Sequence, residues 1–206
     1  MAAPRGHPVF AAVYDRLTRS AERKFLGAHR ARLGSRARGR VLDLGAGTGA
    51  NFPYLDAGAD LLAAEPDPYM LERARQHARA LGRSVTFLAD AAESLSLETA
   101  SVDVVLATLV LCTVDDPARA LGEIRRALRP GGRLLFLEHV RLEHPFWGRL
   151  QDAVTPLWSA LCAGCHPNRD TVGAIQRAGF AIDEIEHYAF GPIPGPLWAC
   201  GVALSA

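Results

Sequence analysis

The sequence lacks the features of a membrane-spanning, secreted or repeat protein. No apolar run reaches the ~18 residues needed to span a bilayer, and the longest, Val104 to Val114, fits a buried strand. The first residues have neither the apolar core nor the cleavage site of a secretory signal. Internal repeats and low-complexity segments are absent, so the 206 residues predict a single domain with one buried core.

Cysteine and net charge are also scarce. Four cysteines without an export signal argue against a disulfide framework, so we expect a cytoplasmic protein. A hydrophobic share of 49% excludes a disordered chain, and the even balance of charges excludes a protein that coats nucleic acid. The net charge of +1 hides a split, because residues 1–40 hold ten Lys and Arg against two Asp and Glu. A basic arm of +8 therefore precedes a body of −7.

Strand and helix patterns alternate from residue 40 onward. Buried strands are predicted at 40–45, 61–65, 85–90, 102–109 and 133–140, and alternating strands at 180–187 and 198–204. Helices are predicted for some six residues after Gly49 and at 66–81, 116–128, 146–162 and 169–178, and Arg129 to Gly132 is predicted to be a sharp stop. This alternation predicts an α/β fold with a parallel sheet and right-handed crossovers.

The basic arm has a helical pattern of its own. An apolar stripe at helical spacing predicts one or two amphipathic helices at about 8–33, with the arginines on the outer face; it comprises Phe10, Val13, Tyr14, Leu17 and Ala21. Gly34 to Gly39 is a basic connector. We therefore divide the chain into a helical segment with its connector at 1–39 and a main domain at 40–206.

A glycine-rich turn follows the first predicted strand, in Val41-Leu-Asp-Leu-Gly-Ala-Gly-Thr-Gly49. Such a turn lets a ligand approach the backbone where a Cβ would collide. Glu65 ends the next apolar strand, where a carboxylate accepts hydrogen bonds from both ribose hydroxyls of an adenosine-type cofactor. A glycine turn alone is a weak signal, but strand, turn, helix, strand and acid together indicate a nucleoside cofactor.

Two cofactors fit this turn. Gly45, Gly47 and Ala50 match a variant of the dinucleotide fingerprint, which favours NAD. Asp43, two residues before the first glycine, would repel a pyrophosphate and suits an ammonium or sulfonium cation. The chain also lacks a further domain to hold a substrate against a nicotinamide. Both points favour S-adenosylmethionine (SAM).

The motif series resembles that of class I SAM-dependent methyltransferases. It consists of Asp43 to Gly49, Glu65, Asp90 and Leu128-Arg-Pro-Gly-Gly132. The resemblance implies a Rossmann-like fold: a seven-stranded, mostly parallel sheet with an antiparallel edge hairpin and helices on both faces. It also implies that the 1–39 segment is a cap. Within it, the helical part at 8–33 is expected to cover the site as a lid.

The similarity is closer to the methyltransferase-like thiol S-methyltransferases, over about residues 40–190. It rests on Gly47 to Phe52, Ser101 to Val105, Thr108 to Cys112, Leu128 to Gly132, Glu138 to Val140, and Gly164-Cys165 followed by Arg169 and an acid. Animal members of that family carry an N-terminal hydrophobic membrane segment, which this sequence lacks. Their acid after the second strand is Asp, whereas this chain has Glu65.

The resemblance implies a set of cofactor contacts. Asp43 orients the amino group of SAM, Glu65 holds the ribose, and Asp90 either binds the adenine amino group or caps the following turn. Thr108 and Leu109 lie near the methyl group. The full set comprises Asp43, Gly45, Ala46, Gly47, Gly49, Asn51, Glu65, Pro66, Asp90, Ala91, Thr108 and Leu109.

A thiol acceptor attacks as a thiolate, so a base or a positive charge near it helps. His139 and His166 are candidate bases, although a loop histidine bound to backbone is the simpler interpretation of each. Cys162-Ala-Gly-Cys-His166 matches the attachment signature of c-type haem, but such haem is attached after export. A second cysteine pair for zinc is lacking. We therefore expect no metal and no haem.

The acceptor is expected to be a small molecule. Enzymes that methylate nucleic-acid bases carry an Asn/Asp-Pro-Pro-aromatic segment, where this chain has Ala107 to Cys112, and the acidic body disfavours polyanions. Phe146, Trp147, Leu157 and Trp158 form either an apolar acceptor pocket or an ordinary helix face. The resemblance favours an alkyl thiol; an aminophospholipid, a quinone-like metabolite and SAM binding without catalysis stay open. We expect the arginines of 8–33 to contact an anionic membrane surface.

Overall fold

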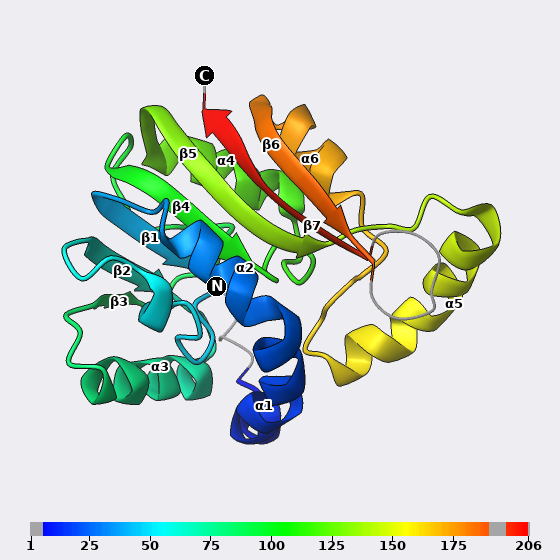
Figure 1. Ribbon diagram of the computed structural model, residues 1–206, viewed down its shortest axis with the longest axis horizontal. Helices are drawn as coiled ribbons and strands as arrows, with labels where there is room; N and C mark the ends of the chain where they lie inside the picture. The colour runs from blue at the N-terminus through cyan, green and yellow to red at the C-terminus, as the bar shows by residue number, and fades with distance from the viewer. Residues whose placement is uncertain (1–5, 190–196, 206) are drawn as a thin grey trace.

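The structure is a computed structural model that describes residues 6–189 and 197–205. Its centre is a seven-stranded sheet in the order β3-β2-β1-β4-β5-β7-β6 (Figure 1). The strands are β1 Arg40–Leu44, β2 Asp60–Ala64, β3 Thr86–Leu88, β4 Val102–Thr108, β5 Leu128–His139, β6 Phe180–Tyr188 and β7 Trp198–Ser205. Neighbours from β3 to β5 pair in parallel, and β7 pairs antiparallel with both β5 and β6. The predicted fold class, including the antiparallel edge hairpin, is confirmed.

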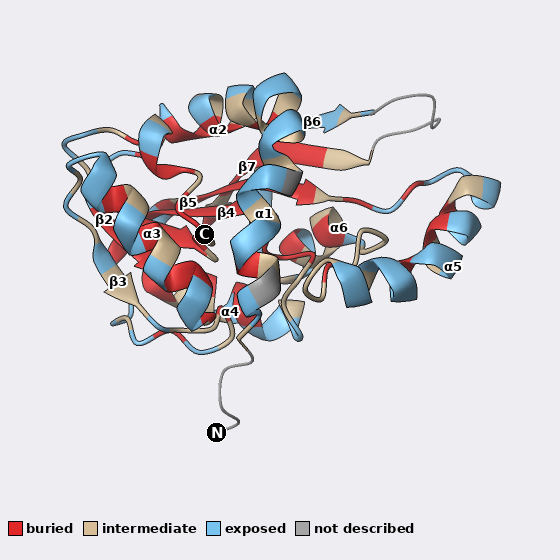
Figure 2. Ribbon diagram, turned by 90° about the horizontal axis from the view of Figure 1, so that it is seen from below, coloured by how far each residue is buried: buried red, intermediate tan, exposed pale blue. Residues whose placement is uncertain are grey.

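Helices cover both faces of this sheet. The helical elements are α1 Pro8–Ala21, a π-helical turn η1 Glu22–Leu26, α2 Gly27–Gly34, a 3₁₀ turn η2 Phe52–Tyr54, α3 Pro68–Ala80, α4 Pro117–Ala127, α5 Pro145–Leu161 and α6 Thr171–Arg177. One core lies between the sheet and α4 with α6, where Leu121, Ile124 and Ile175 are buried. The second lies beneath η1, α2 and α3, and Figure 2 shows buried residues gathered in the strands and on the inner sides of the helices.

Two local predictions are wrong. The α-helix expected after Gly49 is replaced by turns and the 3₁₀ turn η2, because Pro53 begins a new turn and the Phe52 ring packs directly against Gly49. The sharp stop at Arg129 to Gly132 lies inside β5 and not before it. Val102 pairs with Leu128 and Val104 with Arg133, so these residues form a bulge on one long strand.

The basic arm is held to the acidic body by ion pairs. Arg32 contacts Glu186 at 2.5 Å and Arg36 contacts Glu184 at 2.5 Å, both on β6. Apolar contacts add to these, because Leu26 and Leu33 belong to the second core. The charge split seen in the sequence thus reflects in part an arm that docks on its own domain.

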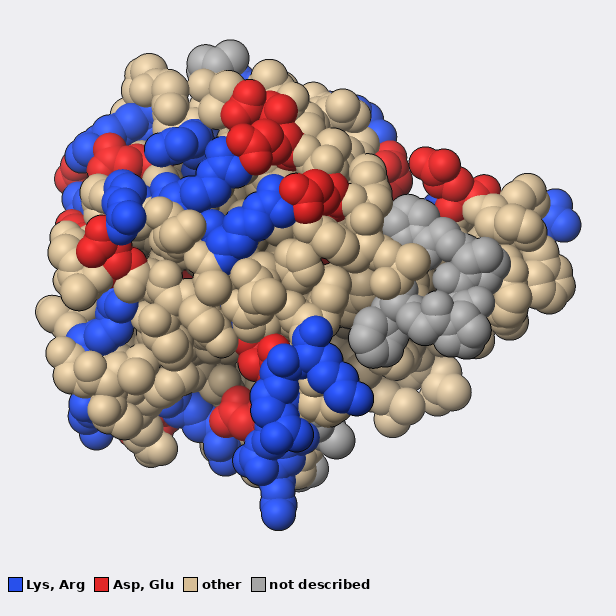
Figure 3. Space-filling model, viewed as in Figure 1, with Lys and Arg blue, Asp and Glu red and all other residues tan. Residues whose placement is uncertain are grey.

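Other basic side chains of the arm point to solvent. The exposed basic residues among those described on α1 and η1 are Arg16, Arg19, Arg23 and Lys24, and Figure 3 shows Lys and Arg gathered where α1 lies at the bottom of the view. At the right of Figure 1, α5 projects from the sheet. Its exposed apolar side chains include Phe146, Leu157 and Leu161. Among the described helices, none is both long and apolar enough to cross a membrane.

Candidate active site

The candidate site lies where β1, β2, β4 and β5 end. The order of the strands reverses between β1 and β4, so the loops after these two strands diverge to opposite faces of the sheet. In open α/β sheets this crevice at the carboxyl ends is where ligands bind. The loops that follow Leu44, Ala64, Thr108 and His139 therefore contain the residues of interest.

The glycine turn after β1 combines tight packing with one open backbone position. Gly45, Gly47 and Gly49 have φ angles of 59°, 57° and 83°, which favour glycine. A Cβ on Gly45 would lie 2.5 Å from Val110, and one on Gly49 would lie 2.5 Å from Phe52. A Cβ on Gly47 would meet no described atom nearer than the Gly45 carbonyl oxygen, 4.0 Å away. Two of the glycines thus serve packing, and the third leaves room for a ligand.

Asp43 is a buried acid with an unused oxygen. Its side chain is fully buried in β1, and Oδ1 accepts a 2.7 Å hydrogen bond from Asn51 Nδ2. Oδ2 has no hydrogen-bond partner within the described residues. Burial raises the pKa of Asp43 to about 7, against the hydrogen bond from Asn51 and the charge of Arg30. This oxygen suits a cationic group brought by a ligand.

Arg30 is a site residue that the sequence analysis did not identify. Its guanidinium, only 4% exposed, reaches from α2 and donates 2.7 Å hydrogen bonds to Asn51 Oδ1 and Thr108 Oγ1. Glu22 in η1 pairs with it at 3.1 Å. The sequence does contain a pattern that indicates it. Arg30 lies four residues after Leu26 and three before Leu33, so it is a cation on the apolar stripe of its helix.

Glu65 joins the turns after β1 and β2. Its Oε2 accepts a hydrogen bond from Gly47 N, and its Oε1 accepts one from Asp67 N, both at 2.9 Å. Burial raises its pKa. Pro66 lies between the two acids, and Asp67 caps α3. Each carboxylate oxygen of Glu65 keeps a further lone pair for a ligand hydroxyl.

Further predicted contacts lie along the same edge. Ala46 is buried and its N–H donates to the carbonyl of Ala64 at 3.0 Å. Asp90 Oδ2 accepts hydrogen bonds from both N and Oγ of Ser96, so it closes the turn that contains Ala91. The adenine contact of Asp90 stays a prediction.

The exit of β4 is strained. Thr108 is buried beneath Arg30, and Leu109 has a φ of 63°, which is costly for a residue with a Cβ. Burial raises the pKa of Tyr14 in α1, and the charge of Arg30 acts against this increase. The N-terminal segment therefore contacts the β4 exit through Arg30 of α2.

Glu138, the penultimate residue of β5, fixes the turn after β4. Its carboxylate is fully buried and accepts hydrogen bonds from the backbone N–H groups of Val110, Leu111 and Cys112 at 2.8, 2.9 and 3.1 Å. Burial raises the pKa of Glu138 to about 7, against these three donors. The next residue, His139, is thereby placed beside that turn.

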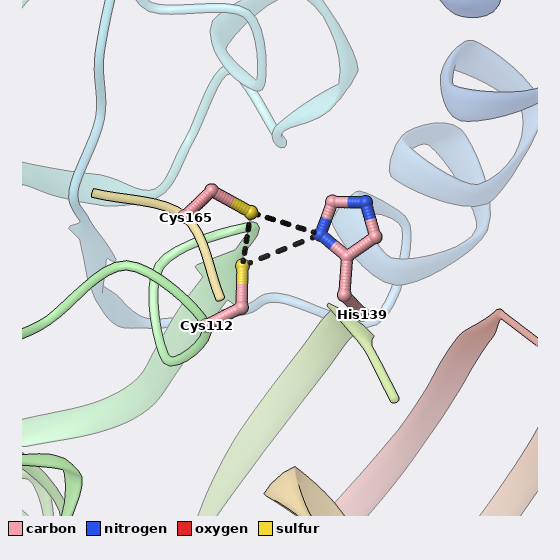
Figure 4. A group of neighbouring side chains, drawn as sticks. All are labelled: Cys112, His139 and Cys165. Carbon is pink, nitrogen blue, oxygen red and sulfur yellow. Dashed lines mark hydrogen bonds between the residues drawn. The ribbon is translucent and has the colours of Figure 1, made fainter. Parts of the chain in front are cut away.

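His139 lies against two cysteines (Figure 4). Cys112 Sγ lies 3.4 Å from His139 Nδ1, and Cys165 Sγ lies 3.5 Å from it. The hydrogen bond with Cys112 and the nearby imidazole lower the pKa of the Cys165 thiol, whereas that same bond and burial raise the pKa of Cys112. Whereas the simpler interpretation was a loop histidine bound to backbone, the Nδ1 atom of His139 lies against two thiols.

The C-x-x-C-H segment does not act as a unit. Cys165 joins Cys112 and His139, whereas Cys162 lies outside this group. His166 donates its backbone N–H to the carbonyl of Cys112 at 2.7 Å, and its Nδ1 is buried without a hydrogen-bond partner in the part of the chain described. The spacing of cysteines along the sequence does not indicate this group, because Cys112 is distant in the chain from Cys165.

The predicted apolar acceptor pocket is an open surface here. Phe146, Leu157 and Trp158 are 63%, 67% and 45% exposed, and Trp147 is half-buried. The end of α5 is joined to the cysteines through the backbone, because the Cys162 N–H donates to the Trp158 carbonyl at 2.8 Å and the Cys165 N–H to the Cys162 carbonyl at 3.0 Å.

A family model, curated relatives and a solved structure that are similar to this chain are all described as methyltransferases. A family model described as "Methyltransferase domain" matches residues 42–136. Human thiol S-methyltransferase TMT1A is 33% identical over 183 residues, which cover 86% of this chain and 75% of that protein. The demethylmenaquinone methyltransferase of Renibacterium salmoninarum is 34% identical over 117 residues, which cover 56% of this chain and 46% of that protein. A solved SAM-dependent methyltransferase of Thermotoga maritima, described as a possible histamine N-methyltransferase, matches with a TM-score of 0.66 and 22% identity, covering 95% of this chain and 99% of that one.

Proposed function

The chain belongs to the family of the TMT1 thiol S-methyltransferases, within the class I SAM-dependent methyltransferases, and we propose that it methylates the sulfur of a small alkyl thiol. The predicted cofactor, SAM, and the predicted enzyme class are confirmed by this membership. The observation that carries the sulfur assignment is His139 beside the β4 exit, because its imidazole lies 3.5 Å from the Cys165 thiol and helps to lower the pKa of that sulfur.

SAM supplies an electrophilic methyl group on a sulfonium, and the site residues fit it. We assign its ammonium to the unused oxygen of Asp43, and the close approach of its methionine part to the open backbone at Gly47. Glu65 would accept the ribose hydroxyls, and Asp90 the adenine amino group. The remaining lining residues in this proposal are Gly45, Ala46, Gly49, Asn51, Pro66, Ala91, Thr108 and Leu109.

Methyl transfer from a sulfonium is an in-line displacement, so alignment of the acceptor is the main task of the protein. Arg30, Asn51 and Thr108 form a buried network that fixes the floor beneath the methyl group. The exposed apolar face of α5, a helix that ends shortly before Cys165, suits the hydrocarbon part of an alkyl thiol. The protein thus offers a polar cofactor side and an apolar acceptor side.

The cap acts in this proposal as a lid over both ligands. Thr48 in the glycine turn donates a 2.7 Å hydrogen bond to Asp15 of α1, so α1 lies along the cofactor turn. Deletion of 1–21 removes α1 and keeps Leu26 and Arg30, and it should slow methylation more than it weakens SAM binding. Equal losses in both measurements would contradict the lid.

The exposed cations of the cap would attract an anionic membrane surface. These are Arg16, Arg19, Arg23 and Lys24, beside a helix α5 with exposed apolar residues. Binding to vesicles rich in phosphatidylserine should be clear at low salt and lost at high salt. Equal recovery with neutral and anionic vesicles would contradict this contact.

An acceptor panel tests the proposed function. Purified protein with SAM is offered 2-mercaptoethanol and longer alkyl thiols, the matching alcohols and amines, a demethylmenaquinone analogue, and phosphatidylethanolamine vesicles. S-adenosylhomocysteine should form with the thiols and not with the matching alcohols, and faster with longer alkyl chains. The quinone is a second candidate because of the demethylmenaquinone methyltransferase relative; turnover with the quinone or lipid and none with thiols would replace the proposal.

A binding measurement shows whether an absence of turnover is due to a wrong acceptor or to a wrong cofactor. SAM should raise the melting temperature of the protein, and NADH should not. Asp43→Asn should lose most of this increase, whereas the exposed Asp60→Asn should keep it. Stabilisation by SAM without turnover on any acceptor would favour a SAM-binding protein that does not catalyse transfer.

A further inference from the structure

Three soft ligand atoms from distant parts of the chain converge beside the β4 exit. Cys112 belongs to the turn after β4, His139 ends β5, and Cys165 follows α5 (Figure 4). Their side chains point toward one another, with both sulfurs facing the same ring nitrogen, Nδ1. All three ligand atoms lie within 4.8 Å of one another, and both cysteines are buried.

The spacing of these atoms matches the faces of a zinc tetrahedron. With Zn–S near 2.3 Å and Zn–N near 2.0 Å, tetrahedral angles place two sulfurs about 3.8 Å apart and sulfur and nitrogen about 3.5 Å apart. The two sulfurs here are 3.7 Å apart, and they lie 3.4 and 3.5 Å from Nδ1.

Other interpretations of the cluster use only part of it. A disulfide between Cys112 and Cys165 would bring the sulfurs to about 2.0 Å and would leave the imidazole without a task. Hydrogen bonding lets Cys165 donate to Cys112 and one thiol donate to the imidazole, but it leaves the equally close approach of the second sulfur to the same nitrogen unused. A common centre that binds all three atoms accounts for both distances.

We propose that Cys112, Cys165 and His139 bind a zinc ion, and that the fourth coordination position of this ion takes the sulfur of the acceptor thiol. Two thiolates and an imidazole are a ligand set that zinc favours. Three protein ligands with one position left for water or substrate are the pattern of catalytic zinc. The zinc site stands on geometry alone, whereas its role toward the acceptor rests on the proposed function.

The surroundings hold the three ligands in place. Cys112 is fixed through its N–H by the Glu138 carboxylate and through its carbonyl by the N–H of His166 at 2.7 Å, next to the third ligand. The ring of His139 stacks on Trp198 with centroids 4.0 Å apart. Such support from outside the ligand set preserves the geometry of a metal site.

The reaction balances without an oxidant or reductant. The acceptor R–SH replaces water on zinc as the thiolate, and its proton passes to solvent. The thiolate electron pair then forms the new S–C bond to the methyl carbon, while the sulfonium C–S bond breaks and its electron pair stays on the sulfur of S-adenosylhomocysteine. The neutral thioether is a weak zinc ligand, so water replaces it. His139 is a metal ligand in this scheme and not a base.

Metal content tests the site without any activity assay. Full-length protein purified with zinc present and chelators absent should contain one zinc per chain by mass spectrometry. After chelation, cobalt should give the charge-transfer bands of thiolate ligands and the strong visible bands of a tetrahedral site. Cys112→Ser, Cys165→Ser and His139→Gln should each lower metal affinity about tenfold or more, whereas Cys162→Ser and His166→Gln should not.

Several results would overturn the zinc site. One is wild-type protein with less than stoichiometric zinc and no cobalt charge-transfer band; this needs no variant, so misfolding of Cys112→Ser cannot obscure it. Another is an equal loss of affinity in Cys162→Ser and Cys165→Ser. A third is a Cys112–Cys165 disulfide in peptide maps of protein purified under reducing conditions.

A thiol titration tests the fourth position and separates the two proposals. Adding 2-mercaptoethanol to the cobalt protein should shift the charge-transfer band, and 2-aminoethanol should not. A bound cobalt whose spectrum ignores thiols would overturn the acceptor role of the metal, even if thiols are methylated. A thiol-induced shift together with methylation of the quinone alone would instead overturn the proposed function and keep the metal site.

Discussion

The buried carboxyl of Asp43 gives a quantitative prediction for the free protein. Its pKa is about 7 when folded and 3.8 ordinarily, so the folded state keeps a proton that the unfolded state loses between these values. The stability linked to this group is therefore full below pH 3.8 and falls by about 1.4 kcal/mol for each pH unit up to 7. The whole loss is about 4 kcal/mol, of which about 3 kcal/mol falls between pH 5 and pH 8.

Urea unfolding of the wild type and Asp43→Asn at pH 5, 6, 7 and 8 measures this effect. The amide cannot ionise and still accepts the hydrogen bond from Asn51, so the variant should gain about 3 kcal/mol on the wild type between pH 5 and pH 8. Glu138 also has a pKa of about 7, but it is present in both proteins and cancels in the difference. Parallel stability curves for the two proteins would refute the reasoning.

The affinity for SAM should depend on pH in the opposite direction to the stability of the free protein. A cationic ammonium beside Asp43 favours the ionised carboxylate, so SAM should bind the wild type more tightly at pH 8 than at pH 6 and should release a proton on binding at pH 6. Arg30 and Glu65, the other charged groups near Asp43, act in opposite directions on it. Calorimetry measures the affinity for SAM at each pH. A wild-type affinity that does not change with pH would contradict a contact between Asp43 and the ammonium of SAM.

Three further substitutions test other parts of the site. Gly47→Ala should weaken SAM binding about tenfold or more in calorimetry, whereas Gly82→Ala, a control with a similar φ and open surroundings, should not; equal effects would exclude a ligand at Gly47. Arg30→Lys should lower the free energy of unfolding by about 2 kcal/mol in urea, since the fork of buried hydrogen bonds is lost. Glu138→Ala should lower it by about 3 kcal/mol or more, because three buried N–H groups lose their acceptor, and an unchanged value would contradict that role.

Elements with strong local patterns could be predicted from the sequence. Buried apolar runs and the glycine turn located β1, β2 and β4, and the late alternating strands indicated the β6–β7 hairpin. The predicted ends of helices and strands were wrong where tertiary packing overrides the local sequence pattern. The Phe52 ring against Gly49 replaces a helix with a 3₁₀ turn, and Arg129 to Gly132 bulge from a strand that pairs on both sides of them.

Parts of the site depend on contacts that no local pattern contains. Arg30 reaches Thr108 across 78 positions of the chain, and Cys112 meets Cys165 across 53. Cys162 and Cys165 form a pair with a known spacing in the sequence. The structure instead brings Cys165 together with Cys112 and His139. Residues within the glycine turn could be named from sequence because neighbouring positions share one loop.

Transfer of a labelled methyl group tests the thiol assignment most directly. SAM with a trideuterated methyl group is incubated with the protein and an alkyl thiol, and the products are followed by mass spectrometry. We predict a thioether that carries the intact trideuterated methyl on sulfur, formed in equal amount to S-adenosylhomocysteine and absent with Asp43→Asn. S-adenosylhomocysteine formed with the label on a quinone or lipid, and none on the thiol, would contradict the assignment.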